Sequence, residues 1–197
     1  GDFNRLAQKL NDSLCYLLNQ NIKGLIIDLR LNGGGAMHPM ILGVEQLLVQ
    51  GKIGSFYTLT KEDWFIRGDR FLVDTVSIAS ISPKCDLDAS NIPVVIITSP
   101  VTGSAAECFI IAFRGRPNTI LLGTATAGYV TVNDGFKIGE NASMNLSIGY
   151  NADRTGKIYK KAFDPDIFMD TPDNFSMIEN DEKIKSALGW LKRSIRQ

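Results

Sequence analysis

The chain has 197 residues, of which 44% are hydrophobic and 21% are charged. This length and composition predict one compact domain, or one domain with a small appendage, whose core needs no disulfide or metal for stability. Lys and Arg total 21, as do Asp and Glu, so the formal net charge is +0. This balance excludes the basic surface expected of a nucleic-acid-binding protein.

The cysteines and the single histidine argue against a metal site. Cys15, Cys85 and Cys108 form no paired framework and lack the Cys-x-x-Cys spacing of structural zinc sites. His38 alone cannot make a histidine-rich catalytic metal site, so we expect neither a metal nor an organic cofactor. No apolar run is long enough to span a membrane, and no signal peptide is visible.

The first half of the chain combines helices with short apolar runs. Residues 3–20 carry leucines at helical spacing and predict an amphipathic helix. Residues 24–30 are typical of a buried strand, and a glycine turn at 32–35 leads into a helix from about residue 39 to residue 49. Alternating and aromatic residues over 53–81 predict strands or hairpins.

The second half repeats the strand–turn–helix pattern and then becomes richer in hairpins. The expected elements, in order, are a buried strand at 93–98, a turn at 99–103, a helix at 104–113, a buried strand at 119–122, antiparallel strands over 135–151, a hairpin turn at 153–156 and a closing helix at 181–195. Strands that alternate with helices, together with a hairpin-rich portion, predict an α/β class.

Two loops that follow buried strands have the composition of a reaction site. Asn32-Gly33-Gly34-Gly35 follows the first strand, and Thr102-Gly103-Ser104 follows the second. In open α/β sheets, ligand sites lie beyond the carboxyl ends of strands. A serine at a tight strand-to-helix turn is held exposed, and backbone N–H groups from the two loops would converge on one carbonyl oxygen as an oxyanion hole.

Ser104 has a structural interpretation as well. Ser104-Ala105-Ala106-Glu107 fits a capping box, in which the serine and the glutamate satisfy backbone donors at a helix start. The glycine turn does not fit a dinucleotide fingerprint, because His38 stands where the third glycine should be, and no phosphate-binding Gly-Lys-Ser/Thr motif is present.

Four motifs in order resemble the tail-specific, or C-terminal-processing, serine peptidase family. They are Asp28-Leu-Arg30 with the following glycines, Thr102-Gly-Ser-Ala-Ala-Glu107, Gly123-Thr-Ala-Thr-Ala-Gly128 and Asp164-Pro-Asp166. The resemblance covers about residues 3–168. It implies a ClpP/crotonase-like spiral of β-β-α units, and a chain of residues 1–197 that forms one peptidase core domain of a longer protein.

The resemblance also implies roles for individual residues. The nucleophile maps to Ser104, and the oxyanion donors map to the N–H groups of Gly34 and Ala105. Glu107, Thr126 and Gly33 map to positions that orient the site or bind substrate. The implied partner is a peptide or protein substrate, and the implied location is extracytoplasmic: periplasmic, cell-surface or secreted.

The general base departs from the family pattern. Classical members use a lysine directly after the motif at 123–128, and that position holds Tyr129 here. The motifs look closer to the histidine-using branch, which includes the tricorn core and the nisin-resistance proteins. Three alternatives remain: a histidine upstream in a longer protein, His38 as a substitute base, or a relative without catalysis.

Two rival functions remain beside the peptidase. The first is a catalytically inactive module that binds peptides or lipids on the same fold. The second is a crotonase-like acyl-CoA enzyme, which shares the oxyanion arrangement but would be indifferent to loss of Ser104. The sequence leaves the oligomeric state open.

Overall fold

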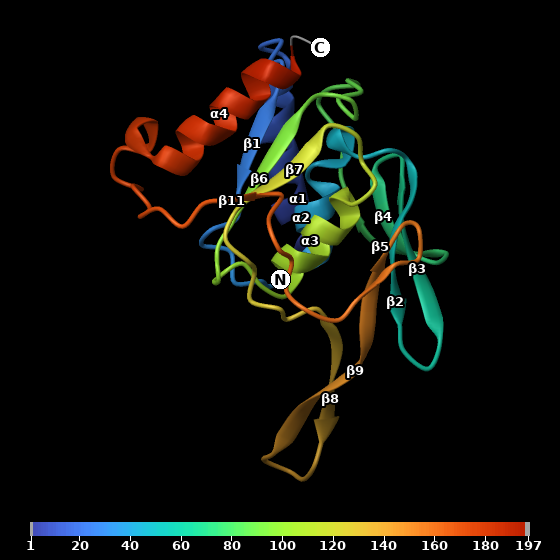
Figure 1. Cartoon of the computed structure of the whole chain (residues 1–197). Coiled ribbons are helices and arrows are strands. Elements are labelled where there is room, and N and C mark those ends of the chain that lie inside the picture. The colour runs from blue at the N-terminus through green and yellow to red at the C-terminus, as the bar shows by residue number, and fades with distance from the viewer. Residues whose placement is uncertain (1, 196–197) are drawn as a thin grey trace.

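The computed structural model describes residues 2–195, and its elements follow the predicted order (Figure 1). The first half contains α1 (Phe3–Leu18), β1 (Leu25–Asp28), α2 (Met37–Leu42), the 3-10 helix η1 (Glu45–Leu47), β2 (Gly51–Tyr57), β3 (Lys61–Arg67), β4 (Arg70–Val73) and β5 (Val76–Ser80). The second half contains β6 (Val94–Thr98), α3 (Ala105–Phe113), β7 (Thr119–Gly123), β8 (Thr131–Lys137), β9 (Ser143–Asp153), β10 (Ile158–Tyr159), β11 (Ile167–Phe168), the 3-10 helix η2 (Ile178–Asn180) and α4 (Glu182–Ser194).

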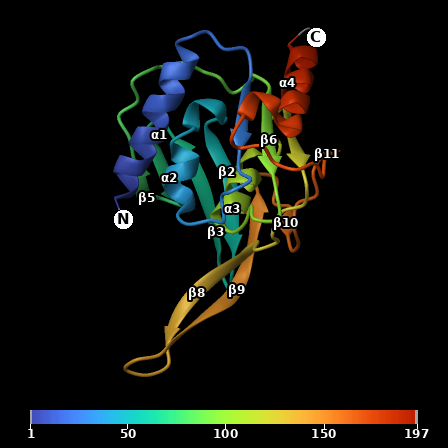
Figure 2. The ribbon, with the colours of Figure 1, turned by 90° about the vertical axis from the view of Figure 1, so that its left-hand side faces the viewer.

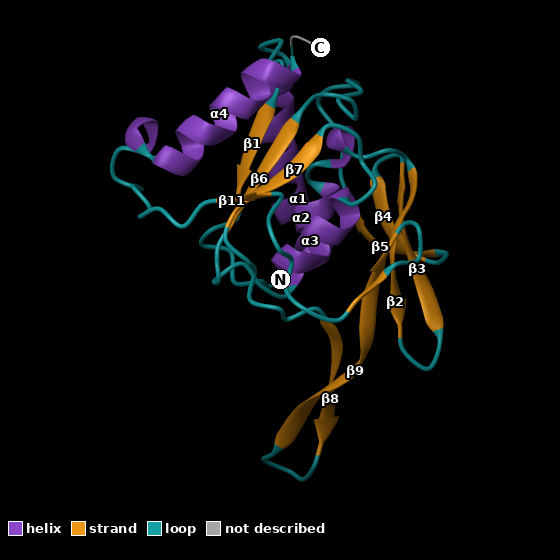
Figure 3. Ribbon diagram, in the orientation of Figure 1, coloured by secondary structure: helices purple, strands orange, loops and turns teal. Residues whose placement is uncertain are grey.

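A four-stranded parallel sheet carries the two predicted loops at one edge. Its strand order is β1-β6-β7-β11, and all three neighbouring pairs are parallel. The carboxyl ends of parallel strands meet at the same edge, so the segments that follow β1, β6 and β7 lie together. Figure 3 shows these loops at the end of the sheet from which the β8–β9 hairpin projects.

Helices cover both faces of this sheet, as its apolar strands require. Figure 2 shows α1 and α2 on one side and α4 on the other. Val95, Ile97 and Leu122 pack with Ala187 and Leu191 of α4. Side chains that alternate with them along the strands enter the larger core with α1, α2 and α3; these include Val94, Ile96 and Leu121.

The second sheet is antiparallel and supplies the hairpin-rich portion. It has seven strands in the order β10-β9-β2-β3-β4-β5, with β8 paired to β9. Trp64, Ile66 and Phe71 face the larger core and are fully buried, which fits the alternation predicted over 53–81. The α/β class with an antiparallel portion is therefore confirmed.

Residues 131–150 form a two-stranded hairpin that projects from the body of the molecule, and we call this hairpin the arm (Figures 1 and 2). The inner end of β9 continues into the body, where it pairs with both β2 and β10. None of the helices in the part of the chain that the structure describes is long and apolar enough to cross a membrane.

The helix predicted over 39–49 is shorter than expected. The structure has α2 at Met37–Leu42, a break at Gly43 and a separate 3-10 turn. A Cβ atom placed on Gly43 would lie 2.7 Å from Cβ of Leu10, so α1 and α2 approach each other where only glycine fits. Tertiary packing at this crossing thus overrides the helical pattern.

The prediction that the cysteines form no paired framework is wrong for two of them. Cys15 of α1 and Cys85 form a disulfide whose Cα atoms are 5.6 Å apart. The two residues are 70 positions apart in the sequence, and no spacing rule connects them. The bond holds the loop after β5 against α1, while Cys108 remains free and buried.

We expect this disulfide to contribute to stability, because it closes a long loop in the unfolded chain. Replacing both cysteines by serine should lower the free energy of unfolding by about 2–4 kcal/mol, measured by urea denaturation. A reducing agent should produce a similar loss in the wild type and no change in the double variant. Equal stability of wild type and double variant would contradict this expectation.

Candidate active site

Three hydrogen bonds join the loop after β1 to the loop after β6. The Ser99 hydroxyl donates to the carbonyl oxygen of Arg30 at 2.7 Å. The Thr102 hydroxyl donates to the carbonyl oxygen of Leu29 at 2.8 Å, and the Gly103 N–H donates to that of Asn32 at 3.1 Å. Ser99 and Thr102 are buried, so these contacts are shielded from water and hold the two turns together.

The joined loops bring Gly34 against Ser104. A Cβ atom on Gly34 would lie 2.8 Å from Cβ of Ser104 and 3.2 Å from its Oγ. The φ angle of Gly34 is +119°, in the region that favours glycine. Both the contact and the backbone conformation therefore require glycine here. Gly33 lies beside them in an exposed part of the same turn, and a Cβ atom on it would be 3.8 Å from the Val101 carbonyl oxygen.

Ser104 occupies a sharp turn at the start of α3. Its φ and ψ angles are 55° and −117°, a conformation that costs a non-glycine residue about 1–3 kcal/mol. The residue is exposed although all of α3 behind it is buried. A strained serine presented at the junction of a strand, a tight turn and a helix matches the geometry of a nucleophile.

Glu107 ties this turn to the loop after β7. Its carboxylate Oε2 accepts the Ser104 N–H at 3.0 Å, as in the predicted capping box. Its Oε1 accepts the Thr126 hydroxyl at 2.5 Å and the Gly128 N–H at 2.9 Å. Thr126 Oγ1 in turn accepts the Phe163 N–H at 2.9 Å. Glu107 is fully buried, so these hydrogen bonds are shielded from water. Together the four bonds orient the backbone of Ser104, while Ser104 itself remains exposed.

The two predicted oxyanion donors differ in their present hydrogen bonds. The Ala105 N–H, in the first turn of α3, finds no acceptor among the described residues. The Gly34 N–H instead donates to Oδ1 of Asn32 at 3.1 Å. The N–H of Ala105 is therefore unpaired among the described residues, whereas the N–H of Gly34 is occupied by the side chain of its own loop.

His38 faces the core rather than Ser104. Its ring centroid lies 5.7 Å from that of Phe3 and 5.1 Å from that of Phe71. Burial lowers its pKa, which favours the neutral ring. No hydrogen bond joins His38 to Ser104 among residues 2–195, and its buried Nδ1 has no partner there. This packing argues against His38 as the base.

Cys108 and Tyr129 also lie near Ser104. Cys108 lies one turn after Ser104, and burial together with the charge of Glu107 raises its thiol pKa to about 12, so it is a poor nucleophile. Tyr129, at the position of the family lysine, is exposed. A Cβ atom on Gly103 would lie 3.0 Å from Cδ2 of Tyr129, which places this tyrosine beside the backbone of the serine loop.

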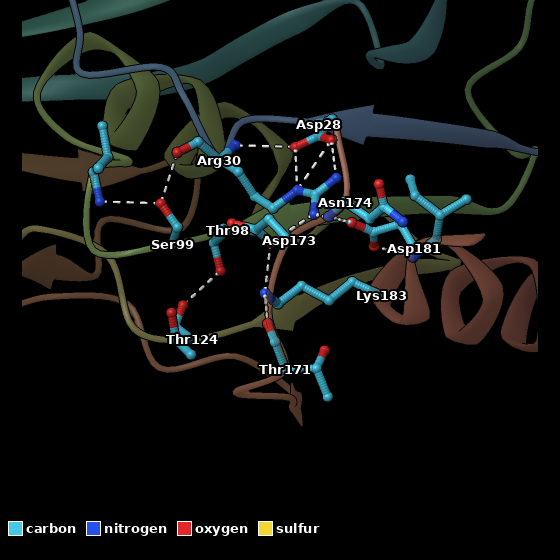
Figure 4. Close-up of polar contacts among 12 residues, drawn as sticks. Asp28, Arg30, Thr98, Ser99, Thr124, Thr171, Asp173, Asn174, Asp181 and Lys183 are labelled. Carbon is cyan, nitrogen blue, oxygen red and sulfur yellow. Dashed lines mark hydrogen bonds and ion pairs between the residues drawn. The ribbon is translucent and has the colours of Figure 1, made fainter. Parts of the chain in front are cut away.

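A cluster of ion pairs around the buried Arg30 supports the loop after β1 (Figure 4). The Arg30 guanidinium is fully buried and pairs with Asp28 at 2.6 Å, Asp173 at 2.6 Å and Asp181 at 2.7 Å. Lys183 pairs with Asp173 at 2.7 Å. Burial opposes the charge on Arg30, but these carboxylates raise its pKa overall. The sequence did not predict that Asp173, Asp181 and Lys183 join this cluster, since they lie more than 140 residues from Arg30.

The model of one protein family matches most of the chain. The model of Peptidase family S41 matches residues 2–169. The nisin-resistance protein of Lactococcus lactis subsp. lactis is 27% identical over 180 residues, which cover 91% of this chain and 53% of that protein. The carboxy-terminal processing protease CtpA of Bacillus subtilis (strain 168) is 24% identical over 92% of this chain and 36% of its own length. The chain thus spans about half, or less, of these relatives.

Solved structures agree with this comparison. A lipoprotein from Streptococcus agalactiae has 27% identity and a TM-score of 0.72, with 98% of this chain and 63% of that chain covered. A photosystem II D1 C-terminal processing protease has 19% identity and a TM-score of 0.60, over 84% of this chain and 39% of that one. At 19% identity, the similarity to this processing protease shows a shared fold alone. The predicted resemblance to tail-specific peptidases, and to the branch that includes the nisin-resistance proteins, is confirmed.

The ion cluster predicts a measurable loss of stability in acid. Burial opposes the charge of Asp181, but Arg30 and the N–H groups of Asn174 and Ile184 lower its pKa from 3.8 to about 2. A lowered pKa stabilises the fold above pH 3.8, and this contribution disappears as the pH falls toward 2. Asp181→Asn should therefore destabilise the protein by roughly 2 kcal/mol at pH 7 and by much less near pH 2.

Thermal or urea unfolding of wild type and variant between pH 2 and pH 7 measures this difference. Glu182→Gln is a matched control, because the Glu182 carboxylate is exposed and, among residues 2–195, forms an ion pair with Lys185 alone, at 2.8 Å. A difference between Asp181→Asn and wild type that stays constant over this pH range would contradict the assignment.

Proposed function

Because the chain belongs to peptidase family S41, we propose that it is the core of a serine endopeptidase that cleaves near the C-termini of peptides or proteins. Ser104 is the nucleophile. The observation that carries this proposal is the strained, exposed turn of Ser104 against the Gly34 loop. A serine that only capped α3 would need neither the positive φ angle nor a glycine turn packed against its side chain.

The proposed reaction proceeds through an acyl-enzyme. The Ser104 Oγ attacks the scissile carbonyl carbon and gives its proton to a base, while the carbonyl oxygen becomes an oxyanion. The Ala105 N–H binds this oxygen together with the Gly34 N–H. The Gly34 N–H becomes free when Asn32 Oδ1 releases it. The amine leaves with the proton, and water then hydrolyses the ester and restores Ser104.

The proposal assigns the base to a histidine. His38 packs against Phe3 and Phe71, so we favour a histidine from outside these 197 residues, in a longer protein. The histidine-using relatives support this choice, because Tyr129 replaces the lysine of the other branch. The alternative function is an inactive peptide- or lipid-binding module; it is favoured by the lack of a hydrogen-bonded base at Ser104 in the described part of the chain.

We also propose an extracytoplasmic location. The Cys15–Cys85 disulfide supports it, since such bonds persist in oxidising compartments and are rare in the cytosol. The similar structure from Streptococcus agalactiae is described as a lipoprotein, and this name is consistent with the same compartment.

A fluorophosphonate probe tests the assignment of Ser104. We expect covalent labelling of the longer protein, and Ser104→Ala should lower the labelling rate at least about 10³-fold, since it removes the attacking atom. Ser13→Ala, at an exposed serine of α1, is the control and should label like the wild type. Labelling is followed by mass spectrometry of the modified peptide.

His38→Phe distinguishes the two sources of the base. If the base lies elsewhere, this variant should keep the labelling rate, because phenylalanine fits the aromatic environment of His38. Loss of labelling in a variant that unfolds at the wild-type temperature would assign the base to His38. Absence of labelling in the wild-type longer protein would contradict the peptidase and favour the binding module.

A further inference from the structure

Asn32 and Gly33 form a pair of residues that is prone to a spontaneous reaction of asparagine. The backbone nitrogen of the next residue can attack the side-chain amide carbon of an asparagine, and a glycine leaves that nitrogen least hindered. Asn32 is the one asparagine of the 197 residues that a glycine follows. The pair lies in the turn after β1, where Gly33 is exposed and Asn32 is partly exposed.

The Gly33 nitrogen is free to act as the nucleophile. Its N–H donates no hydrogen bond within residues 2–195. A Cβ atom on Gly33 would find only the Val101 carbonyl oxygen within 4 Å, at 3.8 Å, so the space around this residue is open. Neither a side chain nor a packed neighbouring segment therefore keeps the amide of Asn32 away from this nitrogen.

The Gly34 N–H activates the carboxamide of Asn32. It donates to Asn32 Oδ1 at 3.1 Å. Attack on the amide carbon turns this oxygen into an oxyanion, and a hydrogen-bond donor that is already in place stabilises such an oxyanion. The donor that we assign to the substrate oxyanion thus serves a side chain of its own loop, and the Asn32 carboxamide takes the role of the substrate amide.

The amide nitrogen of Asn32 is weakly held. In the described part of the chain it donates one hydrogen bond, from Nδ2 to Sδ of Met40 at 3.9 Å, and a thioether sulfur is a weak acceptor. Ammonia can therefore leave without the loss of a strong contact. The attacking, activating and leaving groups of the reaction all belong to residues 32–34, and solvent supplies the water.

From these observations we propose that Asn32 is a self-modification site whose product closes the oxyanion site. The Gly33 nitrogen bonds to the amide carbon of Asn32, and the bond from this carbon to Nδ2 breaks. The proton of the Gly33 N–H passes through water to the departing nitrogen, which leaves as ammonia. Water then opens the resulting succinimide at either carbonyl and leaves aspartate or isoaspartate at position 32.

The product blocks the proposed reaction of Ser104. A carboxylate accepts the Gly34 N–H more strongly than a neutral amide does, so this donor no longer serves a substrate. The added negative charge also repels the oxyanion that forms beside it. In isoaspartate the main chain runs through the side-chain carbon, which lengthens the loop and removes the Asn32 backbone carbonyl that accepts the Gly103 N–H at 3.1 Å. This consequence rests on the proposed peptidase function, whereas the chemistry of Asn32 does not.

Ageing of the folded protein at near-neutral pH tests the chemistry. Peptide mapping by mass spectrometry follows the conversion of amide to acid at Asn32, and an isoaspartate methyltransferase detects isoaspartate. The conversion should run at least as fast as in a synthetic peptide of residues 28–37, because the Gly34 N–H activates the amide. Asn141, an exposed residue of the arm that alanine follows, is the internal control and should keep its amide.

Gly33→Ala separates this reaction from other chemical damage. Gly33 has no positive φ angle, and a Cβ atom there makes only an ordinary contact with Val101, so alanine fits the turn. Its methyl group hinders the close approach of the nitrogen to the amide carbon. We expect the conversion of Asn32 to slow at least about ten-fold, since such reactions depend steeply on the placement of the reacting atoms. An unchanged unfolding temperature shows that the variant remains folded.

Fluorophosphonate labelling of Ser104 measures the consequence. Asn32→Asp carries the charge of the product, whereas Asn32→Ala lacks both the amide and the charge. We expect Asn32→Asp to label about 10²-fold more slowly than Asn32→Ala, which is the usual cost of losing one oxyanion donor. Aged wild-type protein should lose labelling in step with the conversion of Asn32.

Slower conversion of Asn32 in the folded protein than in the peptide would overturn the proposal. Conversion of Asn141 at the same rate would also overturn it, as would labelling that stays constant while Asn32 is converted. The mass measurement does not depend on catalysis. If the fresh protein does not label while Asn32 is converted rapidly, the peptidase function fails and the modification site stands.

Discussion

Hydrogen bonds from Ser99, Thr102 and Gly103 to the carbonyl oxygens of the β1 loop are the constraint on which the rest of the site depends. The loops that they join come from neighbouring parallel strands, so their ends are already close. The buried hydroxyls then hold the turns in one position, where Gly34 meets Ser104. Without this coupling, the strained serine would be an isolated helix cap.

Supporting contacts reach the serine turn from both sides. On one side, the ion pairs of the buried Arg30 link the end of β1 to the segment that leads into α4. On the other side, Glu107 connects the serine backbone to the loop that leads into the arm. Several separate segments of the C-terminal half thus contribute to the position of the Ser104 turn. A precise site requires such support, because small displacements of reacting groups have large effects on rate.

The sequence predicted the elements that depend on local pattern. Periodicity located α1 and the buried strands, and motif order identified the turns of Gly34 and Ser104. It did not predict the break at Gly43, which depends on contact with Leu10 in another helix. Nor did it predict the Cys15–Cys85 disulfide, which joins residues with no local relation in the sequence. Contacts between distant segments carry no periodic signal, and these were the features that the sequence left out.

The most direct test is a crystal structure of the proposed longer protein with a fluorophosphonate bound to Ser104. We expect one phosphoryl oxygen to accept hydrogen bonds from the Ala105 N–H and from the Gly34 N–H, with Asn32 Oδ1 moved away from Gly34. A phosphoryl oxygen that points to solvent while the Asn32–Gly34 bond persists would contradict it, because the paired loops would then form no oxyanion site.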